Sequence, residues 1–256
     1  MASDPARTAL LERLLPIARA AGEAILQVYA TEFEVHDKSD DSPVTEADHR
    51  AEAVILPALA GLTPDVPIVA EEAVAAGNVP HVGERFWLVD PLDGTKEFIK
   101  RNGEFTVNIA LIEFGEPILG VVLAPALNRL YAGAVDHGAF VEDQNGRRKI
   151  GCRDVPAAGL TVVASRSHGD AATLERFLAG RKLATQTNAG SSLKFCLIAA
   201  GEADLYPRFG RTMEWDTAAG HAVLSAAGGR VTTLDGADLR YGKPGFENPH
   251  FVAQGL

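Results

Sequence analysis

The chain has 256 residues, of which 46% are hydrophobic and 23% are charged, a composition typical of a globular protein with a large core in one or two domains. Its formal net charge of −10 argues against a surface for DNA or RNA polymers, because binding a polyanion needs clustered lysine and arginine. A small anionic substrate is compatible with this charge if local positive charge or a metal ion overcomes the acidic field.

Apolar residues recur at helical spacing near the N-terminus, and this spacing predicts a helix from about Pro5 to Tyr29. Thr45 is expected to cap a second helix that runs to Leu59. Other elements expected in this half are strands at 33–36, 67–70, 86–89, 105–113, 117–123, 130–135 and 139–142, turns at 40–43 and 143–148, a loop at 74–83 and a helix opening at 95–98.

The second half alternates between strands and helices, which indicates α/β layers. Strands are expected at 160–164, 183–187, 204–206 and 230–232, and helices at 170–178, 192–200 and 217–226. The composition shifts near residues 153–159. We therefore expect an α+β part over residues 1–155 and an α/β part over residues 156–256.

The N-terminal segment does not read as a secretory signal, because charged residues interrupt its apolar ones. No run reaches the roughly 18 apolar residues needed to span a bilayer. Cys152 and Cys196 are isolated, which favours buried thiols in a reducing compartment. The sequence predicts a cytoplasmic protein without a transmembrane segment. Loose association with the inner membrane stays an alternative that the acidic charge disfavours.

The most informative segment is W-L-V-D-P-L-D-G-T, residues 87–95, an apolar strand that ends in two carboxylates. Asp90 lies where the strand would emerge, and Pro91 is expected to stop the ladder. Asp93 and Gly94 form a turn, and Thr95 opens a helix whose free amides attract phosphate. The alternative is an ordinary turn with Asp93 as N-cap. A phosphatase with an aspartyl nucleophile is disfavoured, because proline stands two residues before Asp93.

Further acids stand at comparable places. Glu71 and Glu72 end a strand, with a surface loop as the alternative, and Asp216 precedes a helix that it could simply cap. Asp48 could complete a capping box with Thr45. Oxygen donors without histidine or cysteine favour Mg²⁺ or Mn²⁺ over zinc. Two such ions can activate water and stabilise the leaving oxygen in a phosphoryl transfer.

W-L-V-D-P-L-D-G-T together with W-D-T-A-A-G at 215–220 resembles the paired signature of the inositol monophosphatase superfamily. S-P-V-T-E-A-D at 42–48 and I-V-A-E-E at 68–72 follow the order and spacing of that family. The resemblance spans most of the chain. It implies lithium-sensitive, Mg²⁺-dependent phosphatase activity and a layered αβαβα sandwich of the inositol monophosphatase/fructose-1,6-bisphosphatase type, α+β in its first part and α/β in its second.

Several stretches resemble one branch of the superfamily, the bacterial 3′(2′),5′-bisphosphate nucleotidases of the CysQ type. These stretches are G-T-K-E-F-I-K-R-N-G-E-F-T-V-N-I-A-L-I from residue 94, S-R-S-H at 165–168, G-S-S-L-K-F at 190–195 and L-Y-P-R-F at 205–209. This likeness implies hydrolysis of adenosine 3′,5′-bisphosphate to AMP and phosphate, as a phosphoric monoester hydrolase of sulfur assimilation. It leaves open whether the 5′-phosphosulfate form is also used.

The resemblance also implies roles for particular residues. The metal ligands would be Glu71, Asp90, the Leu92 carbonyl, Asp93 and Asp216, with Asp90 bridging two ions. Asp48 and Thr95 would orient and deprotonate the attacking water. Two or three Mg²⁺ ions are expected, with Mn²⁺ as a substitute and Li⁺ as an inhibitor. The expected substrate contacts are Gly94, Thr95, Ser165, His168, Gly190, Ser191, Ser192, Lys194 and Arg208.

Alternatives stay open for the substrate and its contacts. Ser167 could cap a helix, Lys194 could be solvated on a helix face, and Arg208 could pair with a surface acid. An inositol monophosphatase or a broad sugar-phosphate phosphatase would use the same metal machinery, and an inactive nucleotide-sensing module would need no water activation. The sequence leaves a monomer and a homodimer equally open.

Overall fold

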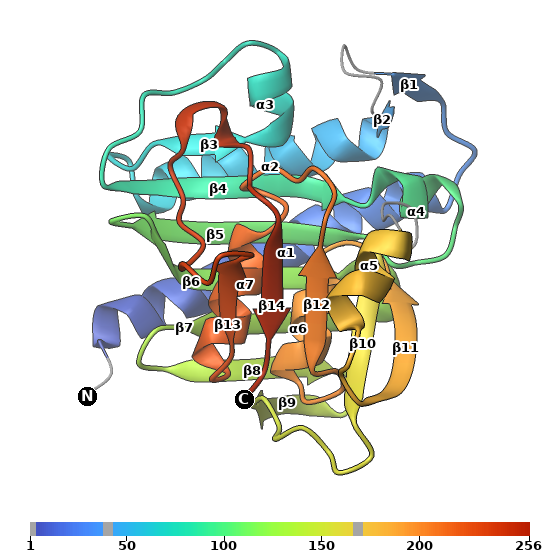
Figure 1. Ribbon diagram of the computed structural model, residues 1–256. Helices are drawn as coiled ribbons and strands as arrows, with labels where there is room; N and C mark the ends of the chain where they lie inside the picture. The colour runs from blue at the N-terminus through green and yellow to red at the C-terminus, as the bar shows by residue number, and fades with distance from the viewer. Residues whose placement is uncertain (1–3, 38–42, 166–170) are drawn as a thin grey trace.

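The computed structural model describes residues 4–37, 43–165 and 171–256, and Figure 1 shows the arrangement of their elements. Within these ranges the strands form a seven-stranded, a five-stranded and a two-stranded sheet. The helices are α1 Pro5–Tyr29, α2 Glu46–Leu62, α3 Glu71–Ala75, α4 Thr95–Ile99, α5 Ala171–Leu178, α6 Leu193–Ala199 and α7 Ala218–Ala226, with 3₁₀ turns η1 Pro125–Leu127 and η2 Pro244–Phe246.

The large sheet has the strand order β3-β4-β5-β6-β7-β8-β9. It is antiparallel except for the parallel pair β3 and β4. Its strands are β3 Ile68–Ala70, β4 Arg85–Asp93, β5 Thr106–Glu113, β6 Glu116–Ala124, β7 Arg129–Ala134, β8 Gly138–Asp143 and β9 Gly146–Ile150.

The smaller sheet has the order β11-β10-β12-β14-β13. Strands β10, β11 and β12 are parallel, whereas β14 runs antiparallel to both of its neighbours. Its strands are β10 Leu160–Ser165, β11 Leu183–Ala189, β12 Leu205–Arg208, β13 Arg230–Thr233 and β14 Phe251–Gln254, and the two-stranded sheet pairs β1 Val35–Asp37 with β2 Pro43–Thr45.

Helices α1 and α2 cover one face of the large sheet. Asp4 caps α1 by accepting a hydrogen bond from the Ala6 amide at 2.9 Å, and Pro5 fits the first helical turn. The apolar stripe of α1 packs with that of α2 against Trp87, Val89 and the other side chains that point to this face. Phe86 and Leu88 point to the opposite face, so both faces are buried and the strands are almost continuously apolar.

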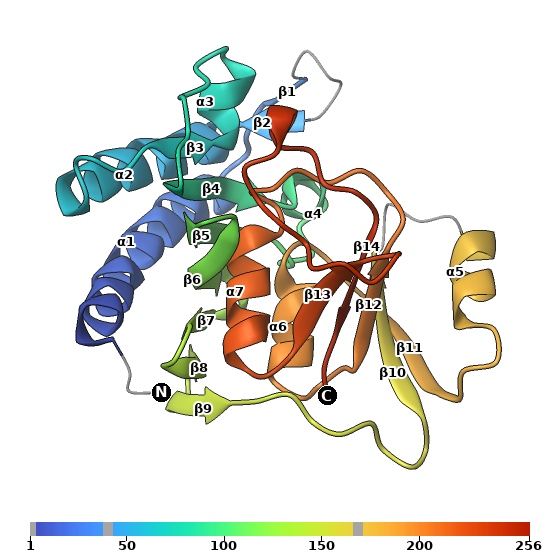
Figure 2. The same ribbon diagram turned by 60° about the vertical axis from the view of Figure 1, so that its left-hand side comes forward.

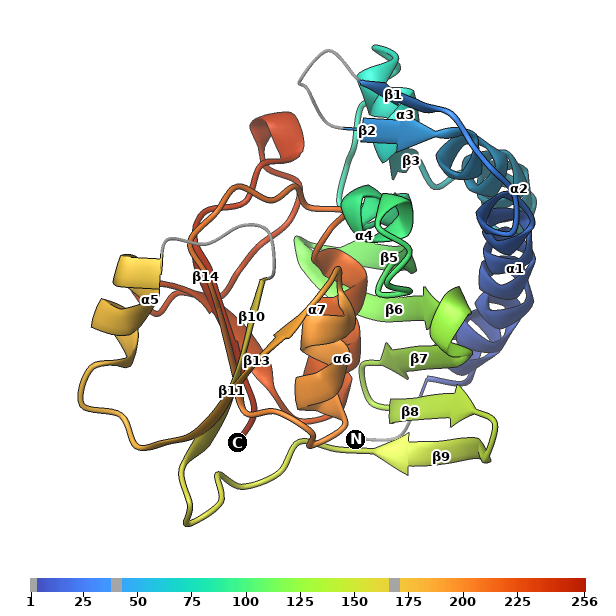
Figure 3. The same ribbon diagram turned by 90° about the vertical axis from the view of Figure 1, so that its right-hand side faces the viewer.

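Helices α6 and α7 fill the space between the two sheets, and α5 covers the outer face of the small sheet (Figure 3). Helix α7 approaches β6 closely because that strand carries Gly120. A Cβ atom there would lie 2.5 Å from the Ala219 carbonyl oxygen and 2.7 Å from Ala222 Cβ. The layers therefore follow the order αβαβα, as Figure 2 also shows, and the predicted sandwich is confirmed.

Several expected boundaries differ from the structure. Strand β4 continues through Pro91, because the ladder pairs Asp90 with Asn108, breaks for two residues and resumes at Asp93. Residues 71–75 form α3, a helix absent from the prediction. The expected turn at 143–148 contains the start of β9, whose exposed charged residues hid its strand character. Strand β14, which lies between β12 and β13, was also missed.

Helix α1 ends at Tyr29, as predicted, and α2 extends three residues beyond Leu59. Among the described residues, no helix combines the length and apolar character needed to cross a membrane.

Candidate active site

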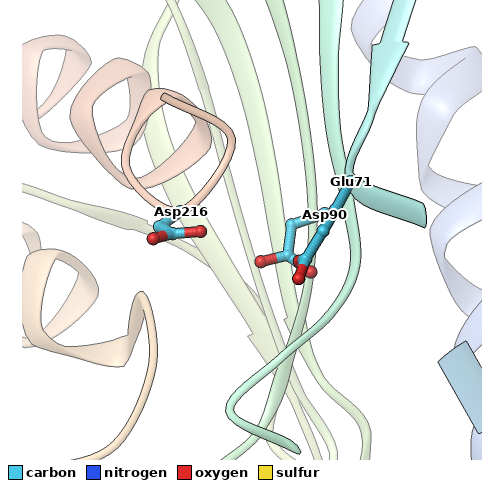
Figure 4. Close-up of side chains that lie close together, drawn as sticks. All are labelled: Glu71, Asp90 and Asp216. Atoms are coloured by element: carbon cyan, nitrogen blue, oxygen red, sulfur yellow. The ribbon is translucent and has the colours of Figure 1, made fainter. Parts of the chain in front are cut away.

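Two acids lie where the parallel pairing of β3 with β4 ends, at one edge of the large sheet. Ala70 pairs with Val89, so Glu71 and Asp90 are the next residues on the two neighbouring strands. Asp90 is 1% exposed and accepts a hydrogen bond from the Leu92 amide at 3.0 Å. The expectation that both acids lie at one rim of a sheet is confirmed, and Figure 4 shows the two side chains next to each other.

Asp216 approaches the same point from the segment that precedes α7 (Figure 4). One carboxylate oxygen from each of Glu71, Asp90 and Asp216 lies within 4.8 Å of the other two. The Met213 amide donates to Asp216 Oδ2 at 2.8 Å and fixes the side chain. The alternative in which Asp216 caps α7 is wrong, because Thr217 occupies the N-cap position.

Electrostatic repulsion characterises this cluster. Burial raises the pKa of Asp216 well above its ordinary value, and the carboxylates of Asp93 and Glu71 raise it further. Burial also raises the pKa of Asp93, although Lys194 opposes that shift. A divalent cation would relieve this repulsion, and carboxylate oxygens are the donors that Mg²⁺ and Mn²⁺ prefer. The residues therefore fit a hard divalent cation.

Asp93 lies beside the cluster, and its Oδ2 is held by protein donors. The Ser192 amide donates to this oxygen at 2.7 Å, Asn108 Nδ2 at 3.2 Å and Thr106 Oγ1 at 3.5 Å. The alternative in which Asp93 caps a helix is wrong, because Gly94 is the N-cap of α4 and adopts a left-handed conformation with a φ of 94°. Since Oδ2 is engaged, Oδ1 is the oxygen of Asp93 with capacity for a cation.

The two carboxylate oxygens of Asp48 have different partners. Its Oδ2 accepts hydrogen bonds from the amide and the hydroxyl of Thr45, both at 2.8 Å, so the capping box is present. Its Oδ1 meets the hydroxyl of Thr95 at 3.4 Å, and that hydroxyl lies equally far from the Leu92 carbonyl oxygen. The capping box therefore fixes the carboxylate so that its second oxygen, Oδ1, faces Thr95.

The acids and Thr95 line a cleft of about 390 Å³ whose opposite wall comes from the second half of the chain. Ser165 ends β10, Gly190 and Ser191 follow β11, and Arg208 ends β12. All four residues line the cleft. They meet because β10, β11 and β12 are parallel, which brings their carboxyl ends to one edge.

Two buried cations support this wall. Lys194, which is 5% exposed, donates to the Ser191 carbonyl at 2.6 Å, and burial lowers its pKa to about 8. A solvated position for this lysine is therefore wrong. Arg208, 8% exposed, donates to the carbonyls of Gly210 at 3.3 Å and Arg211 at 3.0 Å. Both cations lie in the wall and not on the open surface.

The hydroxyls of Ser191 and Ser192 differ in their hydrogen bonding. Ser191 has a φ of 45°, and its Oγ is buried without a hydrogen-bond partner in the part of the chain that the structure describes. This hydroxyl lies within the wall of the cleft that Ser191 helps to line. Ser192 is 1% exposed and donates through Oγ to the Asp216 carbonyl at 2.6 Å. The predicted contact His168 and the proposed cap Ser167 fall outside the described residues.

Sequence reasoning missed two buried polar residues around the site. Asn108 is fully buried in β5 and contacts Asp93; its signal was one amide inside the apolar run 107–112. Glu214 is fully buried beside the W-D motif and accepts hydrogen bonds from the amides of Gly242 at 2.7 Å and Lys243 at 2.9 Å. Its adjacency to Asp216 could have identified it.

Comparison with known proteins agrees with this geometry. The chain is 52% identical over 245 residues to the 3′(2′),5′-bisphosphate nucleotidase CysQ of Escherichia coli K12, a match that covers 94% of this chain and 98% of that protein. It is 53% identical over 245 residues, with the same coverage, to the protein of that name from Salmonella typhimurium.

Two solved structures also resemble this chain over most of its length. CysQ from Bacteroides thetaiotaomicron, described as a bacterial member of the inositol monophosphatase family, matches with a TM-score of 0.82 and 36% identity over 96% of this chain and 97% of that one. An inositol monophosphatase from Anabaena matches with a TM-score of 0.77 and 27% identity over 96% and 90% of the two chains.

The sequence model of the inositol monophosphatase family matches residues 7–254. The signature segments, the αβαβα layers and the converging carboxylates thus agree with one family. This chain belongs to the inositol monophosphatase family.

Proposed function

We propose that this protein is a metal-dependent 3′(2′),5′-bisphosphate nucleotidase that hydrolyses adenosine 3′,5′-bisphosphate to AMP and phosphate. The observation that carries the proposal is the cleft itself. Its floor holds the acids Glu71, Asp90 and Asp216, and its other wall holds the cation Arg208 and the free hydroxyl of Ser191. A substrate with two phosphates needs positive charge at both places: metal ions held by the acids would attract one phosphate, and Arg208 would attract the other.

The floor of the cleft is the proposed metal site. Glu71, Asp90, the Leu92 carbonyl, Asp93 and Asp216 would hold two or three Mg²⁺ ions, with Mn²⁺ as a substitute. Bound ions would supply positive charge for the phosphate and for the departing oxygen. Li⁺ is expected to inhibit by replacing one Mg²⁺.

Asp48 and Thr95 are the proposed base system. Water attacks the phosphorus of the 3′-phosphate while its proton passes to Thr95 Oγ1, and the hydroxyl proton of Thr95 passes to Asp48 Oδ1. The new phosphorus–oxygen bond replaces the bond to the 3′ oxygen. That leaving oxygen takes up a proton from solvent water as AMP departs, and Asp48 returns the proton it received to the solvent. The two 3.4 Å separations around Thr95 Oγ1 would shorten when substrate and water bind.

The second phosphate and the nucleoside would contact the far wall. Gly94 and Thr95 line the cleft beside the reacting phosphate, while Ser165, Gly190 and Ser191 lie across from them. Two of the remaining predicted contacts support this wall: Lys194 holds the loop at 190–192, and Ser192 links that loop to the acids. His168 stays a sequence-based expectation.

The decisive experiment measures phosphate release in Mg²⁺ from adenosine 3′,5′-bisphosphate, inositol 1-phosphate and fructose 1,6-bisphosphate in parallel. We expect the nucleotide to have the highest kcat/KM. A preference for either sugar phosphate would refute the nucleotidase assignment and leave a phosphatase of the same family. The 5′-phosphosulfate form, included as a fourth substrate, tests a role in sulfur metabolism, which we expect to take place in the cytoplasm.

A further inference from the structure

Ser192 connects two segments that reach the acid cluster from different parts of the chain. Its amide donates to Asp93 Oδ2 at 2.7 Å, and its hydroxyl donates to the Asp216 carbonyl at 2.6 Å. Asp93 ends a strand of the large sheet, whereas Asp216 precedes a helix of the middle layer. One residue therefore fixes the separation of two acids that lie 123 positions apart.

Asn108 completes this connection from strand β5. Its Nδ2 donates to Asp93 Oδ2 at 3.2 Å and to Ser192 Oγ at 3.0 Å, so both amide hydrogens are used. The Ser192 hydroxyl accepts from Asn108 and donates to Asp216, and the resulting network has a single consistent direction. Its geometry is thus determined at every atom.

The position of Asn108 is costly for the fold. The side chain is fully buried among apolar neighbours in the strand, and its Oδ1 has no hydrogen-bond partner among the residues that the structure describes. An unpaired buried acceptor carries a desolvation cost. An apolar side chain would avoid that cost but would leave Asp93 and Ser192 without their shared donor.

We infer that Asn108 and Ser192 are positioning residues that set the spacing of Asp93 and Asp216 for a divalent cation. This inference rests on the proposed function, because it assigns those two acids to a metal site. Outer hydrogen bonds that orient metal-binding carboxylates typically change metal affinity by about 10- to 100-fold when removed.

The test measures Mg²⁺ binding to substrate-free protein by isothermal titration calorimetry. Ser192→Ala removes the bond to Asp216 but keeps the backbone bond to Asp93, and Asn108→Ala removes the shared donor. We expect each variant to raise the Kd for Mg²⁺ about tenfold or more. The Mg²⁺ concentration for half-maximal activity should rise in parallel, while kcat at saturating Mg²⁺ stays within about threefold, because Asp48 and Thr95 are untouched.

Thr106→Val is the matched control. Thr106 is also fully buried, and it donates to the same Asp93 oxygen at 3.5 Å, but it makes no contact with the Asp216 segment in the hydrogen bonds of the described chain. Its Kd for Mg²⁺ should stay within about twofold of wild type, because its bond is the longest of the three to Asp93 Oδ2 and the other two, at 2.7 and 3.2 Å, remain. This should hold even if its metal-free melting temperature falls as far as that of Ser192→Ala.

The outcomes separate the inference from the function on which it rests. A wild-type protein that binds no Mg²⁺ would overturn the proposed metal site. A wild type that binds Mg²⁺, with Ser192→Ala binding it equally well, would overturn the positioning role alone. Equal weakening in Ser192→Ala and Thr106→Val would also overturn it, because general loosening of the core would then explain the effect.

Discussion

Replacing Asp90 by asparagine should have opposite effects on the metal-free and the metal-bound protein. The substitution keeps the size of the side chain, and its amide oxygen can still accept the hydrogen bond from the Leu92 amide. It removes one charge from a cluster whose oxygens lie within 4.8 Å of one another. Repulsion and cation binding therefore change together.

The magnitudes follow from Coulomb's law. Two unit charges 4.8 Å apart repel by about 3.5 kcal/mol at an effective dielectric constant of 20. Glu71 and Asp216 are only partly buried, so solvent screens part of this repulsion, and we expect the metal-free variant to gain about 1–2 kcal/mol. The corresponding rise in Tm is about 2–8 °C for a chain of this size.

Activity should change in the other direction. A carboxylate at about 4 Å from a positive charge contributes about 4 kcal/mol at the same dielectric constant, which corresponds to a loss of about a thousandfold in kcat/KM. The assays are thermal unfolding with and without Mg²⁺, and phosphate release from adenosine 3′,5′-bisphosphate.

Glu52→Gln is the control for a nearby acid outside the cluster. Glu52 is a half-buried carboxylate that accepts a hydrogen bond from the Glu72 amide at 3.2 Å, and burial raises its pKa. This variant should keep both its activity and its response to Mg²⁺. Near-normal turnover in Asp90→Asn, or an undiminished rise in Tm on adding Mg²⁺, would refute the reasoning.

Three further predictions follow from the site and its supports. Thr95→Val should lower kcat about 100-fold with an unchanged Mg²⁺ Kd, while Thr95→Ser keeps the hydroxyl and most of the rate; equal losses would exclude the relay to Asp48. The pKa of Lys194 falls from 10.5 to about 8 on folding, so the unfolded chain binds more protons between these two pH values. The unfolding free energy of wild type relative to Lys194→Met, measured by urea titration, should therefore rise from pH 8 to 10.5. A difference that does not change with pH would contradict this prediction. Gly120→Ala would place its Cβ 2.5 Å from the Ala219 carbonyl oxygen. It should lower the free energy of unfolding by about 1–3 kcal/mol and weaken Mg²⁺ binding, as measured by urea unfolding and calorimetry. Unchanged values would show that α7 can shift freely.

Local patterns in the sequence were enough to predict much of the architecture. The helix Pro5–Tyr29 and the strands of the large sheet follow from apolar periodicity and turn residues, because these elements bury long continuous faces. Strand β9 and strand β14 were missed. The first is short, charged and exposed, and the second is a four-residue strand whose place depends on pairing with distant partners.

The acids of the motifs could also be identified one by one as candidates, because carboxylates at strand ends are well placed to bind a ligand or a cation. The sequence did not decide whether these acids cap helices or bind a metal ion. A capping aspartate and a metal-binding aspartate look alike in sequence. Only the packed chain shows that Asp48 completes the capping box of Thr45 with one oxygen and faces Thr95 with the other.

The sequence by itself therefore determined the family, the layers and the candidate acids. The tertiary structure decided which side chains meet. Parallel pairing of β3 with β4 and the close approach of α7 to β6 bring Glu71, Asp90 and Asp216 together. The structure also shows that Ser192 supports the acids and does not line the cleft surface, because its contacts with residues 99 and 24 positions away depend on packing and leave no mark on local sequence.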